Sequence, residues 1–296
     1  MPRKNHYLPQ FYQRRWADAK QRVYVYEKPH DKVIVSTRST KATGWSPDLY
    51  TVPIAPEGQE QALEDRFWRT IDQWGADALA VLESTDAGAV DRLDKTRWAI
   101  FLLSLALRNP EEVAAINRAA EHHFSTSFTE FGERYSELRH DHEPETFEEF
   151  LRQFSEPGLS GYGAEILRAM STNKAIVEQL LAMDWQVVTV ANAPMPLLTS
   201  DRPLIRYRGL RNDDGLLMLP LGPAEFFVAY NRGDVDMQAW ITESIEHGRF
   251  IAAMNEYVVR RAIRFVYGND GDRLDFVSAN FPNVPLPAGI VPTPGL

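Results

Sequence analysis

The spacing of hydrophobic positions changes along the first third of the chain. Two short runs rich in β-branched and aromatic residues, 23–26 and 33–35, come first and are joined by the polar segment 28–32. Runs of this kind with a short connection predict an antiparallel hairpin. From about residue 59, large apolar residues recur every three or four positions as far as Leu82, which predicts a long amphipathic helix.

The same helical spacing continues through the middle of the chain and returns near its end. It predicts helices at 91–108, 111–124, 146–154, 162–182, 236–247 and 250–267. The dipeptide Asn109-Pro110 separates the first two, and a glycine-rich turn at 158–161 precedes the fourth. The longest apolar run, 98–107, is far shorter than the about twenty residues that a membrane span needs, so we interpret it as a buried helix.

Short apolar runs separated by turn residues follow this helical block. They predict strands at 185–190, 197–199, 216–219 and 225–230, with a further extended segment at 204–207. We expect the four strands to pair antiparallel, because their connections are too short for parallel crossovers.

The order of the elements predicts an α+β fold, in which a mostly helical central block packs with a small antiparallel sheet. No low-complexity linker divides the chain, so we expect a single domain over residues 1–296. It would consist of a helical lobe at about 56–184 and a strand-rich lobe at about 185–232, with the N-terminal hairpin at 22–36. The proline-rich tail from Phe281 is expected to be irregular.

Composition narrows the chemistry. The chain is 44% hydrophobic and 25% charged, which is typical of a globular protein. It has no cysteine, so disulfides, thiolate metal sites and cysteine nucleophiles are excluded, and a reducing cytoplasm would suit it. The basic residues at the N-terminus are not followed by an apolar segment of the kind found in signal peptides, and we predict a cytoplasmic location without membrane association.

The net charge of −9 is unevenly distributed. Residues 1–41 carry ten Lys and Arg against three Asp and Glu, a net +7, which leaves −16 for the remaining chain. The acidic remainder argues against a broad nucleic-acid surface. The basic N-terminal patch is suited to a local phosphate-containing ligand, to nucleic acid or to an acidic partner. The alternative is that its cations pair with carboxylates of the chain itself.

The first seventeen residues combine aromatic and polar side chains in an unusual way. Pro9 fits the first turn of a short helix at 9–17, on which Tyr12 and Trp16 share a face and should be buried. The polar side chains nearby are candidates for substrate binding, together with an arginine that ends the most apolar helix. They are Gln10, Arg14, Arg15 and Arg108.

Two further residues are candidates for catalysis. His6 can act as a general base or a metal ligand. Asp201 follows an apolar strand, where side chains can converge on a cleft. Together with Glu64 on the first long helix, they would supply ligands for a divalent metal ion. The structural alternatives are a turn that Asp201 stabilises, a histidine that bonds a buried carboxylate and a salt bridge at Glu64.

These motifs resemble those of a large bacterial family of unknown function. His6-Tyr7-Leu8-Pro9-Gln10-Phe11 with Arg14-Arg15-Trp16 is similar to its HYxPxFxLRxF opening, and Thr199-Ser200-Asp201-Arg202-Pro203 is similar to its TSDNP motif. Pro220-Leu221-Gly222-Pro223 and Arg108-Asn109-Pro110 resemble its PLSP and RTP steps. This chain differs by Arg202 in place of asparagine and by Gln13 in place of an aliphatic residue. The resemblance implies a bacterial setting and candidate positions, and it does not imply an activity.

The sequence leaves two hypotheses of different kinds. The first is a metal-dependent phosphodiesterase or nuclease of a defence or toxin type, with His6 and Asp201 at its centre and arginine stabilising phosphate charge. The alternative is a non-catalytic module that binds a ligand or a partner. A third interpretation is that the N-terminal polar cluster only fixes the terminus to the core.

Overall fold

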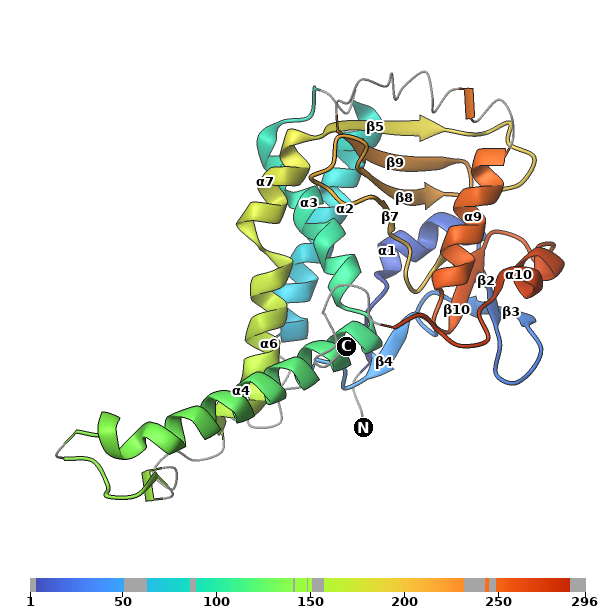
Figure 1. Cartoon of the computed structure of the whole chain (residues 1–296). Helices are drawn as coiled ribbons and strands as arrows, with labels where there is room; N and C mark the ends of the chain where they lie inside the picture. The colour runs from blue at the N-terminus through green and yellow to red at the C-terminus, as the bar shows by residue number, and fades with distance from the viewer. Residues whose placement is uncertain are drawn as a thin grey trace.

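Figure 1 shows a helical layer beside stacked sheets, with the long helix α4 extending away from the rest of the molecule. The computed structural model describes residues 4–50, 63–85, 89–140, 142–147, 149–150, 157–231, 243–244 and 249–287. Within this part, the helical segments are α1 (Gln10–Gln13), a 3-10 turn (Arg14–Trp16), a π-helical turn (Leu63–Trp68), α2 (Arg69–Ser84), α3 (Arg92–Leu107), α4 (Pro110–Leu138), α6 (Pro157–Ser171), α7 (Lys174–Ala182), α9 (Arg249–Arg261) and α10 (Leu274–Asn280).

The strands of the described residues form three antiparallel sheets. Their bounds are β1 (Lys4–His6), β2 (Arg22–Glu27), β3 (Ile34–Ser39), β4 (Trp45–Pro47), β5 (Asp184–Thr189), β6 (Thr199–Ser200), β7 (Ile205–Tyr207), β8 (Leu216–Gly222), β9 (Glu225–Tyr230) and β10 (Phe265–Gly268). The strand orders are β1-β4, β3-β2-β10-β6 and β5-β9-β8-β7. The predicted α+β class and the N-terminal hairpin β2-β3 are therefore confirmed.

The central strands β8 and β9 of the sheet β5-β9-β8-β7 are buried on both faces. Leu217, Leu219 and Phe227 belong to the core cluster that includes helices α2 and α3. Their sequence neighbours Met218 and Val228 belong to a second cluster, which includes α9. Because successive side chains of a strand point to opposite faces, β8 and β9 read as continuous apolar runs rather than as alternating ones.

Aromatic contacts join the helical layer to this sheet. Trp98 of α3 lies edge-on to Phe227 of β9, with 5.6 Å between the ring centroids. Trp185 of β5 contacts the same phenylalanine at 5.2 Å, also edge-on. All three side chains are buried. Edge-to-face aromatic pairs add about 0.5–1.5 kcal/mol beyond the burial of their area, so Phe227 is a strong link between the two layers.

One strand joins a different sheet from the one predicted. Residues 197–199 were expected to pair with the strands at 185–190, 216–219 and 225–230. Instead β5 pairs with β9, and β6 pairs with β10 in the sheet that contains the N-terminal hairpin. The partner of β6 is therefore a strand about 65 positions later in the chain, and the short connections on either side of β6 do not determine this pairing.

Several predicted helix boundaries are wrong. α4 continues to Leu138 instead of ending near residue 124, and residues 158–161 are helical, within α6, rather than a turn. The helix predicted at 162–182 is interrupted at Asn173, whose side chain accepts a hydrogen bond from Ile176 N and begins α7. The last predicted helix stops at Arg261, because Phe265–Gly268 pairs with β2 as strand β10.

Parts of three predicted helices lie outside the described residues. They are the beginning of the helix from about residue 59, the end of the helix at 146–154 and most of the helix at 236–247. Among the helices that the structure describes, none combines the length and the apolar character that crossing a bilayer requires.

Candidate functional site

The N-terminal aromatic residues are anchors, as their spacing predicted. Tyr12 and Trp16 are fully buried. The hydroxyl of Tyr12 lies 2.8 Å from Thr199 Oγ1 and donates to the carbonyl of Pro220 at 2.8 Å, and the indole of Trp16 donates to Leu197 O at 2.8 Å. These bonds connect the first helix to two motifs about two hundred positions away, which shows that the opening motif holds the fold together.

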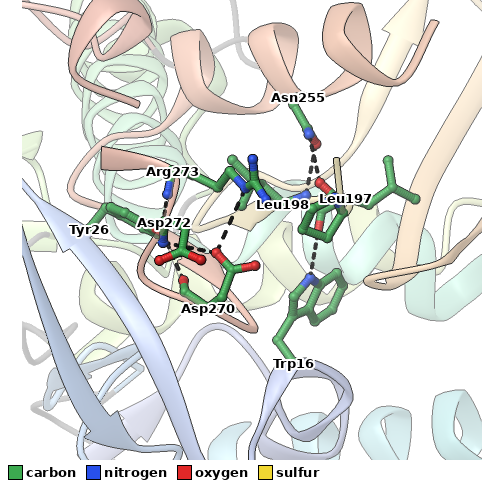
Figure 2. A network of polar contacts seen from close by, with 9 residues as sticks. Trp16, Tyr26, Leu197, Leu198, Asn255, Asp270, Asp272 and Arg273 are labelled. Carbon is green, nitrogen blue, oxygen red and sulfur yellow. Dashed lines mark hydrogen bonds and ion pairs between the residues drawn. The ribbon is translucent and has the colours of Figure 1, made fainter. Parts of the chain in front are cut away.

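The side chain of Asn255 binds the segment 196–198, which Trp16 also contacts. Asn255 of α9 accepts a hydrogen bond from Leu198 N at 2.8 Å and donates to Pro196 O at 2.9 Å. Figure 2 shows Asn255 and Trp16 reaching residues 197 and 198 from opposite sides. The chain that leads into the Thr199–Pro203 motif is therefore fixed on both sides.

The polar residues of the opening helix differ in their surroundings. Arg15 donates through Nε to Leu221 O at 2.7 Å and pairs with Glu83 and Glu225. Arg14 is exposed and Gln10 is half-buried. Arg15 thus pairs with carboxylates of the chain itself, as the alternative interpretation of the basic N-terminus expects, and substrate binding by Gln10, Arg14 and Arg15 stays a prediction.

His6 lies at the end of β1 in a partly buried position. Its Nε2 is shielded from solvent and has no hydrogen-bond partner among the residues that the structure describes. Burial lowers the pKa of His6 to about 4, and the charges of Lys4 and Arg108 add to this effect. A hydrogen bond between the imidazole and the backbone of Thr40 acts in the opposite direction. The imidazole is therefore neutral at pH 7, which leaves it able to accept a proton or a hydrogen bond.

Arg108 is near His6 and completely buried. Its Nη1 donates to Asp72 Oδ1 at 2.6 Å, and its guanidinium carbon lies 5.7 Å from the ring centroids of Trp68 and Phe101. In the described part of the chain, its Nε and Nη2 have no hydrogen-bond partner. Burial raises the pKa of Asp72, and the charge of Arg108 opposes that change. The structure thus brings the two predicted residues His6 and Arg108 into one electrostatic neighbourhood.

Asp201 is bonded to backbone groups. Its Oδ1 accepts from Ile263 N at 2.8 Å, and its Oδ2 accepts from Arg264 N at 2.7 Å and Phe265 N at 2.9 Å. Burial raises the pKa of Asp201 to about 6, although these bonds act in the opposite direction. The carboxylate therefore holds the turn between α9 and β10, which is a structural role but not the local turn at residues 199–203 that the sequence offered as the alternative.

His6 and Asp201 do not share a direct hydrogen bond, because the bonds of Asp201 within the described part of the chain go to the turn before β10. The side chain of Glu64 lies outside the described residues. No group of three or more His, Asp and Glu side chains close enough to hold a metal ion occurs among those that are described. Catalysis by His6 and Asp201, and metal binding by these two with Glu64, stay predictions.

Arg202, the departure from the family motif, lines a small polar cavity of about 20 Å³. Its Nη1 donates to the carbonyls of Leu286 and Pro287 at 2.7 and 3.2 Å, and its Nη2 lies 3.8 Å from Glu112 Oε1. Its Nε and Nη2 are buried and make no hydrogen bond to any described residue. The side chain of Arg202 is only 5% exposed, so three N–H donors of a buried guanidinium have no hydrogen-bond acceptor among the described residues.

A much larger pocket adjoins this cavity. It has a volume of about 420 Å³ and lies between α9 and the β7–β8 edge of the sheet. Six apolar and aromatic side chains form most of its wall, namely Ile205, Tyr207, Met218, Phe250, Met254 and Tyr257. Arg206 lines both the pocket and the cavity.

Sequence reasoning missed this pocket, although part of the signal was present. Phe250, Met254, Tyr257 and Arg261 follow one another at spacings of four, three and four, which places them along one face of α9. The pattern predicts an apolar stripe that ends in a cation. It does not say that the strand at 205–207 lies opposite this stripe, because that arrangement depends on the sheet.

Comparisons with known proteins identify the family of this chain but do not indicate an activity. No curated protein and no solved structure matches the chain. A family model described as a protein of unknown function, DUF4238, matches residues 4–272. The matched segment includes the opening motif, Arg108, the Thr199–Pro203 motif and the pocket beside α9. The resemblance seen in the sequence is therefore confirmed, and the chain belongs to the DUF4238 family of proteins of unknown function.

Proposed function

We propose that this chain is a binding module for a small apolar molecule, which occupies the pocket between α9 and the β7–β8 edge. The observation that carries the proposal is the pocket itself. Its volume of about 420 Å³ falls within the about 300–1,000 Å³ that ligand sites have, and apolar and aromatic side chains line most of it.

The walls of the pocket are held in place by the fold. Tyr257 accepts a hydrogen bond from Arg206 N at 3.5 Å and donates to Arg206 O at 3.2 Å, which ties α9 to the edge strand β7. On the opposite side, β8 is buried along its whole length and pairs with both β7 and β9. A pocket between two fixed elements is preorganised, so little free energy is needed to form it when a ligand binds.

A neutral fluorescent probe and one bulky substitution test this proposal. N-phenyl-1-naphthylamine should bind the intact chain at one saturable site. Ala253→Trp places a large ring at an exposed position of the pocket wall and should weaken binding at least tenfold. Arg260→Trp, on an exposed position of α9 that does not line the pocket, is the matched control and should bind as the wild type does. Equal affinity in all three proteins would refute the proposal.

Unpaired groups at a second place favour the hydrolase hypothesis. His6 Nε2 and Arg108 Nε and Nη2 are buried and make no hydrogen bond within the described ranges, and the charge of Arg108 acts on His6. Arginine stabilises phosphate charge and a neutral imidazole can accept a hydrogen bond or bind a metal ion, which supports an enzyme acting on a phosphate ester, with a divalent metal ion as its expected cofactor. Hydrolysis of bis-p-nitrophenyl phosphate with Mg²⁺ or Mn²⁺, abolished in His6→Ala, tests it. An inactive wild type would count against this second candidate.

A further inference from the structure

The pocket between α9 and the β7–β8 edge has a buried floor and a more exposed rim. Its floor consists of five apolar side chains that are each at most 9% exposed, namely Ile205, Leu216, Met218, Phe250 and Met254. Its rim consists of residues that are exposed or half-buried, namely Arg206, Tyr207, Asp214, Ala253 and Tyr257. The inner part of a ligand therefore meets hydrocarbon and thioether groups, and the outer part meets two tyrosine rings.

The floor carries two thioethers on opposite walls. Met218 belongs to β8 and Met254 to α9, and the ring of Phe250 lies next to them in the lining. A methionine sulfur is polarisable and makes favourable contacts with the edges of aromatic rings. A wall that combines thioethers with a phenylalanine therefore favours a ring over an alkyl group of the same size.

The lining offers no buried polar atom that lacks a partner. None of the buried side-chain nitrogen and oxygen atoms that make no hydrogen bond to a described residue belongs to a residue that lines this pocket. A polar group that a ligand carried to the floor would lose its bonds to water and gain none. The buried part of the ligand is therefore apolar.

The rim tyrosines are held in place by contacts within the chain. The hydroxyl of Tyr257 bonds the backbone of Arg206, and the hydroxyl of Tyr207 accepts from Arg208 Nε at 3.2 Å. The guanidinium carbons of Arg261 and Arg208 lie 5.5 and 5.4 Å from the centroids of the Tyr257 and Tyr207 rings. Rings that are already fixed lose little side-chain entropy when a ligand packs against them.

The charged residues of the rim are engaged as well. Asp214 pairs with Arg208 at 3.1 Å, and Arg206 has an interaction of its own. The rim therefore gives no reason to expect a charged group on the ligand.

We infer that the ligand of this pocket contains a neutral aromatic ring system, which contacts the two floor methionines and the rim tyrosines. This inference rests on the proposed function, because it assigns a chemical class to the ligand of the same pocket. A saturated hydrocarbon of the same skeleton would bury a similar area, but it would lose the sulfur–ring and ring–ring contacts.

Two compounds with the same carbon skeleton and the same hydroxyl test the inference. 2-Naphthol and decahydro-2-naphthol are both neutral at pH 7 and are titrated into the full chain by calorimetry. 2-Naphthol should bind about two- to tenfold more tightly, the effect of one or more sulfur–aromatic contacts. Burial of area alone predicts no such preference, because the saturated compound is not the smaller of the two.

Substitutions at the floor show whether the sulfur atoms cause the preference. Met218→Leu and Met254→Leu keep the volume, and each should weaken 2-naphthol binding about two- to tenfold and leave decahydro-2-naphthol binding unchanged. Met183→Leu is the matched control, because Met183 is equally buried but does not line the pocket. It should change neither affinity. Should a floor variant fail to fold, Tyr207→Leu at the rim, where the side chain is 49% exposed, should lower the affinity for 2-naphthol selectively.

The outcomes separate the inference from the proposed function. If both compounds bind the wild type equally, or if the methionine variants weaken both to the same extent or neither, the aromatic assignment is wrong and the binding pocket stands. If neither compound nor N-phenyl-1-naphthylamine binds the wild type, the proposed function itself fails.

Discussion

Trp16 donates a hydrogen bond from its indole nitrogen to the carbonyl oxygen of Leu197, at 2.8 Å and across 181 positions of the chain. Tyr12, one helical turn earlier, bonds Thr199 and the carbonyl of Pro220. The two aromatic rings also contact each other, with 5.2 Å between their centroids. The N-terminal motif therefore fixes the position of the Thr199–Pro203 motif, and these two family signatures form one structural unit.

Removing the polar atoms of this unit should destabilise the chain. Tyr12→Phe deletes a hydroxyl with two buried partners, and we expect a loss of about 1–3 kcal/mol in the free energy of unfolding, measured by urea denaturation. Trp16→Phe should have a similar effect, because Leu197 O is left without its donor. Arg14→Ala, at an exposed position of the adjoining 3-10 turn, should stay within about 0.5 kcal/mol of the wild type. Equal stabilities of Tyr12→Phe and Arg14→Ala would contradict this account.

Asp201→Asn should loosen the turn between α9 and β10. The amide replaces one acceptor oxygen by a donor that faces backbone N–H groups, so we expect a loss of about 2–4 kcal/mol. Hydrogen exchange should accelerate first at the amides of Ile263, Arg264 and Phe265. Asp18→Asn is the matched control, because Asp18 also accepts from two backbone N–H groups, Lys20 N and Arg22 N, but at the surface. A smaller loss of stability is expected there, and unchanged exchange in Asp201→Asn would argue against the structural role.

The ionisation of His6 should make stability depend on pH. Its pKa is about 4 in the folded chain and near 6.5 when unfolded, so the unfolded state binds more protons between these values. The contribution of His6 to stability is therefore complete above pH 6.5 and is lost as the pH falls toward 4. His6→Asn should remove this part of the pH dependence. The raised pKa of Asp201 makes stability change with pH in the opposite direction, but this effect is the same in both proteins and cancels in the comparison. A His6 resonance that titrates near 6.5 by NMR would show that this prediction is wrong.

Asp72→Asn should be more harmful than the loss of an ordinary ion pair. It leaves the fully buried guanidinium of Arg108 without a carboxylate, and breaking a buried pair costs about 3–5 kcal/mol, less here because Asp72 is partly exposed. Arg108→Met keeps the volume and removes the charge. The double variant Asp72→Asn with Arg108→Met should therefore be more stable than the sum of the single losses predicts. Additive losses would indicate that the two charges are not coupled.

Local pattern was sufficient for much of the fold. The hairpin at 22–36 forms because β-branched and aromatic runs flank a turn, and α3 begins at the N-cap Asp91 and ends before Asn109-Pro110, as the sequence predicts. The burial of Tyr12 and Trp16 also follows from their spacing alone. These features depend on residues within a few positions of one another, so the sequence determines them directly.

Tertiary structure decided what depends on distant residues. β6 leaves its sequence neighbours to pair with β10, and residues 265–268 form a strand rather than the end of a helix because β2 supplies hydrogen-bond partners. Asp201 bonds backbone amides that are 62 to 64 positions away, whereas its sequence context offered only a cleft or a local turn, because partners so distant in sequence cannot be read from neighbouring residues.

The candidate site divides in the same way. The sequence offered His6 and Arg108 as candidates because of their chemistry, but the electrostatic interaction between them depends on how β1 and the end of α3 are placed. The pocket and the adjacent cavity could not be predicted from the sequence, because their walls come from two segments about fifty positions apart. Arg202 and Arg206 belong to the first segment, and Tyr257 and Arg261 belong to α9. Residue type sets which chemistry a side chain can perform, and only the packing of sheet against helix decides which side chains meet.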